Sequence, residues 1–438
     1  MIVKNRLTIK SLISAEDGPV SIGGWVETVR DQKKVQFVVV RDETAAVQLV
    51  NVRHGADDER ANLISALTLG SFVEVTGDLV HNEKVKLNGM EIQLDTIAVV
   101  GAALPDNPIS SDSSIEKRLD WRFLDLRRPE QALIFRIQTT FEQGLRNYWI
   151  DKGFFEIHTP KLMASPSESR AELFQVPYFD TTAYLAQSPQ HFKQMAQSAG
   201  FGGVFEIAPA FRADPSFTSR HATEFTSIDM EVSWIDSHED IARLHEEALV
   251  AAFTAVVDKH GEDIEKLYGQ TLTVPTLPFP RIPLAEVREI LAAGGYVIPR
   301  ADGDLDPEGE RRISAYVQEK YGHDFVFVTD YDVAIRPFYH MRHTDDPTLT
   351  NSYDLIYRGT EISTGAQREH RPDVLAQQAQ EKGLDVAELE TYINFFRYGV
   401  PPHGGYGMGL ARVLMLMLGL PSIRETTYLF RGPNHLRP

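Results

Sequence analysis

Two stretches far apart in the chain carry residue types suited to binding a nucleoside triphosphate. The stretch 211–231, FRADPSFTSRHATEFTSIDME, interleaves two arginines and a histidine with four carboxylates: Arg212, Arg220, His221, Asp214, Glu224, Asp229 and Glu231. The stretch 405–413, GYGMGLARV, is a glycine run that opens an apolar helix carrying Arg412. Guanidinium groups bind phosphate oxygens in pairs and stay charged throughout a reaction. Together the stretches predict one ATP site, although each alone would read equally as a solvated loop or a buried helix.

The order of these stretches resembles the second and third motifs of class II aminoacyl-tRNA synthetases. The matching patterns are F-R-x-(D/E), R-H-x-x-E-F and G-x-G-x-x-R. Two further segments, QSPQHFKQ at 187–194 and EISTGAQREH at 361–370, make the chain similar to aspartyl-tRNA synthetases of the compact archaeal type. The resemblance runs essentially end to end. It implies an enzyme that activates L-aspartate with ATP and transfers it to tRNA-Asp, and it leaves open whether tRNA-Asn is also charged.

The resemblance implies roles for the residues of the ATP site. Arg212 would bind the α-phosphate, where fixed cations stabilise the charge that develops as a carboxylate attacks. Arg220 and His221 suit the outer phosphates. Phe225 would stack on adenine, with Arg412 as a cation–π partner on the opposite face. Catalysis is thus assigned to Arg212, His221 and Arg412, and ATP binding to these three with Asp214, Arg220, Phe225 and Glu361.

A pair of carboxylates flanks a predicted turn in YDLIYRGTEIS. If 358–359 is a two-residue hairpin turn, Ile356 pairs with Glu361, so Asp354 and Glu361 share a face about 7–8 Å apart. Carboxylates with phosphate oxygens are the ligands that Mg²⁺ prefers. Thr364 offers a hydroxyl, either as a further ligand or as a hydrogen-bonding group for the substrate. The pattern predicts Mg²⁺ held by Asp354, Glu361 and Thr364, with two carboxylates on a solvated hairpin as the alternative.

Amino-acid selection is predicted to rest on two cations, Lys193 and Arg368, both apt for a side-chain carboxylate. Gln190 could orient that carboxylate. By resemblance, Asp229 receives the substrate ammonium and Glu168, on the loop SPSESRAELF, closes over it. The predicted aspartate site comprises Glu168, Gln190, Lys193, Arg212, Asp229, Thr364 and Arg368.

Four positions depart from the family pattern. Asp214 and Ala411 stand where glutamate is usual, Thr364 where serine is common, and 169–170 where a glycine pair is usual. Ala411 removes a possible orienting partner of Arg412. None of the four deletes a group that adenylate formation directly needs.

Length, charge and residue composition limit the kinds of protein that this chain can be. The 438 residues suffice for two or three domains, and the formal charge of −18 argues against a generally basic nucleic-acid surface. This charge does not exclude a large folded RNA that is held by a few local basic patches of the protein and by base contacts. No apolar run reaches transmembrane length and the segment MIVKNRLTIK lacks a signal-peptide core, so the expected location is the cytoplasm, away from membranes. The absence of cysteine excludes disulfides and thiolate chemistry.

The predicted fold class is α+β, with an N-terminal barrel and a catalytic domain. Residues 19–100 read as short alternating strands, KVKLNG among them, which predicts an OB-type barrel with Gly77 at a corner. The predicted domains are an anticodon-binding barrel at 1–102, a linker at 103–130 and a class II catalytic domain at 131–438 with an antiparallel sheet flanked by helices.

Within the catalytic domain, helical spacing predicts helices at about 131–152, 241–259 and 306–321. FFEIHTPKL is predicted as a strand interrupted by Pro160. The first helix and this strand resemble the first class II motif, which implies a homodimer. A plain helix–strand pair of the core is the alternative.

In the barrel, Phe37, Gln48 and Glu91, with Arg30 nearby, fall where the family reads anticodon bases. Phe37 would stack a base, while Gln48 and Glu91 would discriminate by hydrogen bonds. Pattern alone makes Phe37 equally a residue of the barrel core.

Three other functions fit parts of the pattern. An asparaginyl-tRNA synthetase is disfavoured by Lys193, and a tRNA-free enzyme that amidates aspartate is disfavoured by the intact barrel. A catalytically silent RNA-binding paralogue is supported only by Ala411 and the altered loop at 169–170.

Overall fold

The computed structural model describes residues 7–55, 58–164, 173–216 and 218–437. The chain divides into two compact units, Met1–Ala132 and Leu133–Pro438. The first holds the predicted barrel and the second holds the ATP motifs. In the described residues, no helix combines the length and apolar character needed to cross a membrane.

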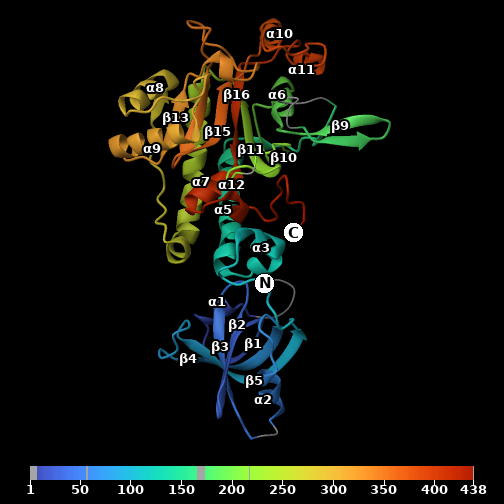
Figure 1. Cartoon of the computed structure of the whole chain (residues 1–438), viewed down its shortest axis with the longest axis vertical. Coiled ribbons are helices and arrows are strands. Elements are labelled where there is room, and N and C mark those ends of the chain that lie inside the picture. The colour runs from blue at the N-terminus through green and yellow to red at the C-terminus, as the bar shows by residue number, and fades with distance from the viewer. Residues whose placement is uncertain (1–6, 56–57, 165–172, 217, 438) are drawn as a thin grey trace. The chain divides into compact units, whose positions relative to one another are not determined.

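The first unit is built on a closed five-stranded barrel (Figure 1). The strand order is β1-β2-β3-β5-β4, with β1 Gly18–Asp31, β2 Val35–Arg41, β3 Ala46–Val52, β4 Phe72–His81 and β5 Met90–Gly101. Two short helices, α1 (Ile9–Leu12) and α2 (Glu59–Ser65), accompany the strands. Gly77 lies at a register shift of β4 on β5, and a Cβ there would clash with the carbonyl oxygen of Gln93. The predicted OB-type barrel and its glycine corner are confirmed.

One predicted strand of the barrel is wrong. KVKLNG, residues 84–89, forms the turn that joins β4 to β5. Asn88 and Gly89 adopt positive φ angles of 57° and 63°, and the Asn82 amide donates to the Gly89 carbonyl at 2.8 Å. Asparagine and glycine tolerate this left-handed geometry, so the Asn-Gly pair ends the extended run.

The predicted linker is partly helical. Irregular chain follows β5, and then two short helices, α3 (Ile115–Asp120) and α4 (Arg122–Asp125), precede the long helix α5 (Pro129–Asp151). The predicted helix at about 131–152 therefore begins two residues earlier and ends one residue earlier than expected.

An eight-stranded sheet forms the centre of the second unit. Its order is β12-β13-β14-β15-β16-β11-β10-β6, with β6 Phe155–Glu156, β10 Gly203–Phe211, β11 Glu224–Ser233, β12 Arg281–Pro283, β13 Phe325–Thr329, β14 Ser352–Tyr357, β15 Thr360–Gln367 and β16 His403–Gly409. The interior strands pair antiparallel, as predicted, whereas β12 and β6 pair parallel at the two edges. The α+β class is confirmed.

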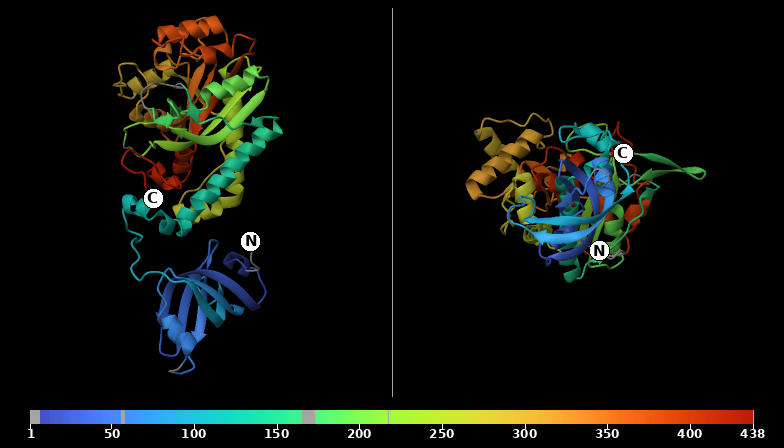
Figure 2. Two further views of the ribbon diagram at one scale, coloured as in Figure 1. Left: turned by 90° about the vertical axis from the view of Figure 1, so that its right-hand side faces the viewer. Right: turned by 90° about the horizontal axis from the view of Figure 1, so that it is seen from below.

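Two long helices, α5 and α7 (His238–Tyr268), lie side by side against this sheet (Figure 2). Apolar residues of both helices share a core with the sheet, and Gly144 permits the close approach because a Cβ there would lie 2.8 Å from the Cα of Ala252. A capping box at Ser237 starts α7, and Gly269 in the left-handed region ends it. The predicted helix at 241–259 is the middle of this longer helix.

The remaining helices of the second unit are α6 (Gln190–Ser198), α8 (Leu284–Ala293), α9 (Pro307–Tyr321), α10 (Pro372–Glu381), α11 (Glu390–Asn394), α12 (Leu410–Met417) and α13 (Ile423–Thr426). A smaller sheet, β7-β9-β8, is formed by Leu162–Met163, Thr181–Leu185 and Gln175–Tyr178, and its β8–β9 hairpin extends away from the main sheet (Figure 1).

The segment FFEIHTPKL is interrupted, as predicted, but the extended residues on the two sides of Pro160 belong to different sheets. Only Phe155–Glu156 and, beyond Pro160, Leu162–Met163 are extended in sheets. Between them the Thr159 amide and hydroxyl both donate to the Glu206 carboxylate, each at 2.7 Å. This side chain replaces a neighbouring strand as the acceptor, and Pro160 has no amide to donate.

Candidate active site

A cavity of about 370 Å³ collects most of the predicted site residues. Those lining it are Gln190, Lys193, Arg212, Asp214, Arg220, His221, Phe225, Asp229, Glu361, Thr364, Arg368 and Arg412. Asp354 lies behind this lining and is 6% exposed, and Glu168 lies outside the described residues. The predicted ATP and aspartate sites thus meet in one cavity.

Strand pairing explains why the two motif stretches meet. Strand β11 pairs antiparallel with β16, so Asp229 lies opposite Gly407. The glycines of β16 permit this packing, because a Cβ at Gly405 would clash with the Met230 carbonyl and one at Gly407 would lie 3.2 Å from the Asp229 carboxylate. The glycine run is therefore a strand, and the apolar helix predicted after it is α12.

Three arginines from the motifs face the cavity. Arg412 Nη1 donates to the Glu361 carbonyl at 2.9 Å, which ties α12 to β15. The Arg212 guanidinium lies 5.4 Å from the centre of the Phe225 ring. Arg212 is thus the cation already next to the predicted adenine-stacking ring, and Arg412 is anchored to the backbone near the predicted metal ligands. Guanidinium groups fixed in this way suit a triphosphate.

His221 lies among these arginines and is held by Thr218, whose hydroxyl hydrogen-bonds to His221 Nδ1. Burial and the Arg412 charge lower the pKa of His221. The lowered pKa favours the neutral imidazole, which still has one ring N–H to donate to a phosphate oxygen.

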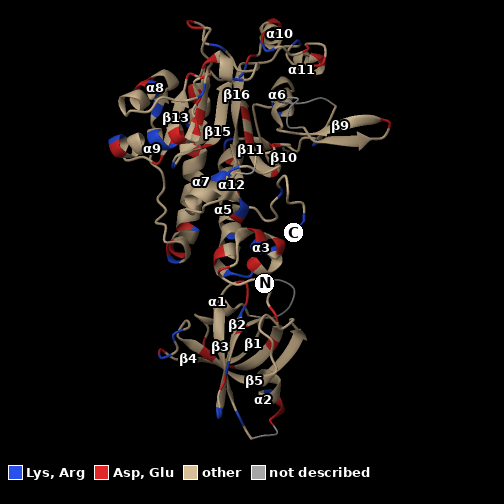
Figure 3. Ribbon diagram, in the orientation of Figure 1, with Lys and Arg blue, Asp and Glu red and all other residues tan. Residues whose placement is uncertain are grey.

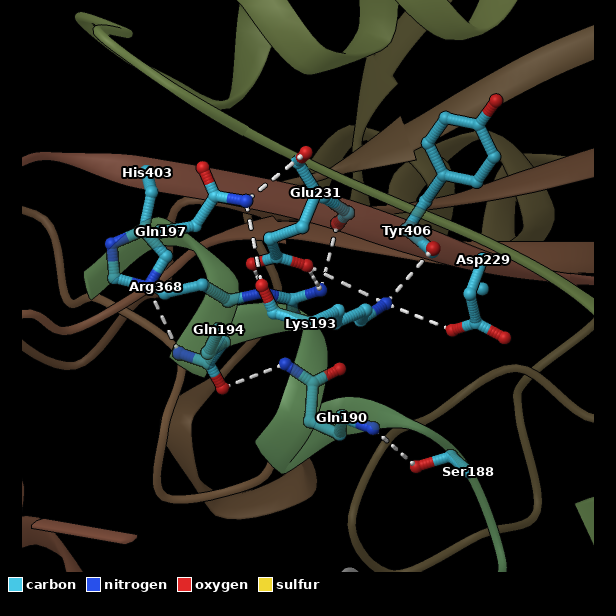
Figure 4. Close-up of polar contacts among 12 residues, drawn as sticks. Ser188, Gln190, Lys193, Gln194, Gln197, Asp229, Glu231, Arg368, His403 and Tyr406 are labelled. Atoms are coloured by element: carbon cyan, nitrogen blue, oxygen red, sulfur yellow. Dashed lines mark hydrogen bonds and ion pairs between the residues drawn. The ribbon is translucent and has the colours of Figure 1, made fainter. Parts of the chain in front are cut away.

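Lys193, on α6, is buried at the end of the cavity where the sequence predicts aspartate binding (Figure 4). Its Nζ lies 2.9 Å from Asp229 Oδ1 and 3.5 Å from Glu231 Oε2, and donates to the Tyr406 carbonyl at 3.0 Å. Asp229 also accepts from the Ser227 hydroxyl. The ammonium group is therefore fixed in direction by three oxygens.

Arg368, on the loop after β15, shares a carboxylate with Lys193 (Figure 4). Its Nε and Nη2 donate to the two oxygens of Glu231 at 2.8 and 3.2 Å, and Nη2 donates to the Gly405 carbonyl at 2.9 Å. Burial alone would raise the pKa of Glu231, but the Arg368 and Lys193 cations hold it below its ordinary value. Glu231 thus stays ionised and holds both cations in place.

Glu231 belongs to a motif stretch but has no predicted role, and the structure places it between the two buried cations. The signal was present, because Asp229 and Glu231 lie two apart on one strand and therefore share a face. Arg336 and His340 also line the cavity and belong to no motif, so nothing in the sequence distinguished them.

The predicted hairpin of β14 and β15 is confirmed. Arg358 and Gly359 form the turn with φ angles of 45° and 80°, and Ile356 pairs with Glu361. The register beyond this pair differs from a regular hairpin, because a shift between Leu355 and Ile356 places Asp354 opposite Thr364 in place of Ser363. The Thr364 hydroxyl donates to Asp354 Oδ1 at 2.7 Å. The other oxygen, Oδ2, lies 2.8 Å from Arg336 Nη2.

These residues can hold a divalent cation only with further ligands. Among the described residues, no three histidine, cysteine or acidic side chains are grouped to bind a metal by themselves. Burial and the nearby Asp354 charge raise the pKa of Glu361, which means that the two carboxylates repel each other. Two like charges beside a cavity that is predicted to bind a triphosphate favour a cation shared with phosphate oxygens. The donor set therefore fits Mg²⁺ bound together with ATP.

The four predicted anticodon-binding residues lie together on the outer face of the barrel. Gln36 and Val38 alternate with Phe37 along β2 and are buried, whereas Phe37 is only partly buried and is not part of the core. The Arg30 guanidinium lies 5.1 Å from the Phe37 ring centre and donates to Gln48 at 2.6 Å. Gln48 in turn donates to Glu91 at 3.2 Å. The alternative that Phe37 belongs to the barrel core is wrong.

Two protein families match the two units. The family described as tRNA synthetases class II (D, K and N) matches residues 114–431, and the OB-fold nucleic acid binding domain family matches residues 20–100. The chain therefore belongs to the class II aminoacyl-tRNA synthetases, in the group for aspartate, lysine and asparagine, and it is an aminoacyl-tRNA ligase.

Individual relatives within this family are similar over nearly the whole chain. The Aspartate–tRNA(Asp/Asn) ligase of Aeropyrum pernix is 39% identical, with 100% of both chains covered. The Aspartate–tRNA(Asp) ligase of Thermococcus kodakarensis is 39% identical over 96% of each chain. Among solved structures, the asparaginyl-tRNA synthetase of Pyrococcus horikoshii complexed with asparaginyl-adenylate superposes with a TM-score of 0.92, at 30% identity and full coverage of both chains.

Proposed function

We propose that this chain is an aspartate–tRNA ligase that activates L-aspartate with ATP and transfers it to the 3′ end of tRNA-Asp. The observation that carries the proposal is the buried pair of cations, Lys193 and Arg368, at one end of the cavity that also contains the motif arginines. A pocket that presents two fixed cations suits a side-chain carboxylate and disfavours a neutral amide. The asparaginyl alternative shares the fold, so only this pocket chemistry separates the two.

In the proposed first step, an oxygen of the aspartate α-carboxylate attacks the α-phosphorus of ATP. The new bond forms aspartyl-adenylate, and pyrophosphate leaves with the electron pair of the broken P–O bond. Arg212 would stabilise the charge on the α-phosphate, while Arg220 and His221 would bind the outer phosphates. Phe225 and Arg412 would enclose the adenine. No protein nucleophile is required, because the side chains position the reactants and stabilise charge.

In the proposed aspartate site, the substrate side chain would bind Lys193 and Arg368, with Gln190 beside it. Asp229 would receive the substrate ammonium, in place of part of its present contact with Lys193 at 2.9 Å. Glu231 would keep both cations oriented during this exchange. The tRNA ribose hydroxyl then attacks the activated carbonyl carbon, and AMP leaves.

Mg²⁺ is proposed to be held by Asp354, Glu361 and Thr364 together with ATP phosphates, where it would neutralise phosphate charge. Glu361 opens onto the cavity, whereas Asp354 reaches it through Thr364. We further propose a homodimer formed through the segment around Pro160, which sedimentation equilibrium would test. Phe37, Gln48, Glu91 and Arg30 are proposed to read the anticodon.

The proposal is tested by pyrophosphate exchange with aspartate or asparagine, followed by charging of purified tRNA-Asp and tRNA-Asn. Exchange that depends on aspartate and not on asparagine is expected, together with charging of tRNA-Asp. Charging of both tRNAs would define the wider specificity that the name of the Aeropyrum pernix relative includes. Absence of exchange, with tRNA binding intact, would favour a silent RNA-binding paralogue instead.

Replacing Phe37 by alanine is expected to raise KM for tRNA by about tenfold to a hundredfold, because one lost base stack costs roughly 1–3 kcal/mol. Aspartate-dependent exchange should stay close to that of the parent, since the barrel holds none of the residues that line the cavity. The measurement is aminoacylation kinetics with tRNA as the varied substrate.

The control for this prediction is Val38→Ala on the same strand. Val38 is 1% exposed and belongs to the barrel core, so its truncation should lower thermal stability without a comparable change in tRNA KM. A Phe37→Ala protein that melts earlier but whose folded fraction charges tRNA normally would contradict the assignment of Phe37 to the tRNA site.

A further inference from the structure

Glu310 is a buried carboxylate that lies next to the active-site cavity but outside every motif. It belongs to α9, a helix that carries basic and acidic residues close together (Figure 3). Its neighbour Glu308 pairs with Arg311 and Arg312 on the exposed side of the helix. Glu310 is only 8% exposed. A carboxylate is seldom buried unless a charge or several hydrogen bonds compensate its loss of water.

A single oxygen of Glu310 contacts two motif segments. Oε2 accepts from Arg220 Nη1 at 2.9 Å and from the backbone amide of Glu361 at 3.1 Å. Arg220 comes from the stretch before β11, and Glu361 lies on β15, which carries two of the three predicted metal ligands. The carboxylate therefore ties the proposed outer-phosphate arginine to the hairpin strand that carries Glu361.

A second contact fixes α9 against the same hairpin. Four residues after Glu310, the Ser314 hydroxyl oxygen accepts from the Gly359 amide in the hairpin turn at 2.9 Å. Residues four apart lie on one face of a helix, so Glu310 and Ser314 present a common edge to β15. Glu310 contacts Arg220, which lines the cavity, whereas the Ser314 contact is with the hairpin turn.

The Glu310 contact can hold the Arg220 guanidinium in an orientation that suits phosphate binding. An arginine side chain has many rotamers, and fixing it before the substrate binds removes that entropic cost from the binding step. The guanidinium has five N–H donors, and the Glu310 contact engages Nη1. Donors remain for phosphate oxygens while the charge is held in one direction.

We propose that Glu310 is a positioning residue for ATP, which orients Arg220 toward the outer phosphates. The inference rests on the proposed phosphate-binding role of Arg220 and adds a residue from α9 to that site. Because Glu310 acts through Arg220, its loss should affect ATP and leave aspartate binding unchanged.

The experiment compares Glu310→Ala, Glu310→Gln and Ser314→Ala with the parent by pyrophosphate exchange, varying ATP and aspartate separately. Glu310→Ala should raise KM for ATP by roughly tenfold, the scale of one lost charge-assisted hydrogen bond, with KM for aspartate unchanged. Glu310→Gln keeps an acceptor for Arg220 and the Glu361 amide, so it should recover part of the loss. Ser314→Ala, the matched control on the same helix face, should stay within twofold of the parent in both KM values.

A double-mutant cycle with Arg220→Ala separates this inference from the proposed ATP site. Arg220→Ala with Glu310→Ala should be no worse for ATP than Arg220→Ala alone, since residues that act as one unit are not additive. Additive effects would overturn the inference. A normal KM for ATP in Glu310→Gln and Glu310→Ala, with Arg220→Ala impaired, would also overturn it while leaving the ATP site intact. A normal KM for ATP in Arg220→Ala would instead overturn the proposed role of Arg220.

If Glu310→Ala does not fold, Glu310→Gln alone decides the question. Loss of the negative charge with the same shape should still raise KM for ATP relative to Ser314→Ala, at equal thermal stability. An unchanged KM for ATP in folded Glu310→Gln would overturn the positioning role.

Discussion

Replacing Lys193 by methionine is expected to lower kcat/KM for aspartate in pyrophosphate exchange by roughly 10⁴-fold. Losses of this size occur when a polar group in a binding pocket is left without its hydrogen-bonding partner. The substrate carboxylate would then enter a buried site that retains Asp229 and Glu231 but has lost one of its two cations. Repulsion from those two carboxylates adds to the missing attraction. ATP binding, measured separately, should change little because the motif arginines are untouched.

The same substitution should reduce the preference for aspartate over asparagine. With Lys193 removed, the neutral amide no longer suffers a disadvantage against the carboxylate at that position. Exchange with asparagine as the variable substrate measures this ratio directly. If kcat/KM for aspartate stays within a fewfold of the parent, Lys193 does not select the substrate.

Stability must be separated from selection in this experiment. Removing one member of a buried ion pair leaves the other uncompensated and can cost about 3–5 kcal/mol. Gln197→Met provides the matched control, since Gln197 is buried one turn further along α6, accepts from the Ser233 hydroxyl at 2.6 Å and does not line the cavity. It should lower thermal stability and leave aspartate kinetics near those of the parent.

The sequence predicted those parts of the site that local rules determine. The Arg-Gly turn at 358–359 required a two-residue hairpin, and that turn fixed the pairing of Ile356 with Glu361. Lys193 and Arg368 were found through motifs, because charge alone does not distinguish a buried cation from a solvated one. Their shared partner Glu231 shows how two such cations can both be buried.

The errors arose where a side chain from a distant segment decided the backbone. The Glu206 carboxylate accepts hydrogen bonds from the amide and the hydroxyl of Thr159. The segment FFEIHTPKL is therefore not a continuous strand. In the same way Arg336 and Glu310 reach the cavity region from segments that carry no motif, and only the folded chain brings them together. The period-two alternation on β2 predicts two faces but does not identify which of them packs into the barrel core. Only the barrel itself shows that Phe37 lies on the outer face.

The choice between the two proposed metal ligands matters for the next experiment. Asp354 already has a partner for each oxygen, Thr364 at 2.7 Å and Arg336 at 2.8 Å. Replacing Asp354 would leave the buried Arg336 cation uncompensated, so lost activity would not distinguish a metal ligand from a structural ion pair. Glu361 is the better position, since its nearest cation, Arg412, lies 4.0 Å away.

Glu361→Gln keeps the shape of the side chain and removes one negative charge from the proposed ion site. Adenylate formation is expected to fall by on the order of 10²–10³-fold, comparable to the loss of one fixed group that stabilises transition-state charge. The apparent Mg²⁺ requirement of the residual activity should rise, because a weaker ligand set needs more free ion to be filled. Pyrophosphate exchange measured across a Mg²⁺ titration gives both quantities.

The matched control is Asp324→Asn, the same carboxylate-to-amide change at the residue that precedes β13. Asp324 accepts from Arg358 Nε at 2.9 Å at the hairpin turn and does not line the cavity, so this substitution should leave the Mg²⁺ dependence unchanged. Both variants should retain tRNA binding, because the barrel is a separate compact unit. If Glu361→Gln has the same exchange rates as the parent at low Mg²⁺, Glu361 is not a metal ligand. Another positive charge must then offset the repulsion between Glu361 and Asp354. Arg336 and Arg412 are the groups that can do so.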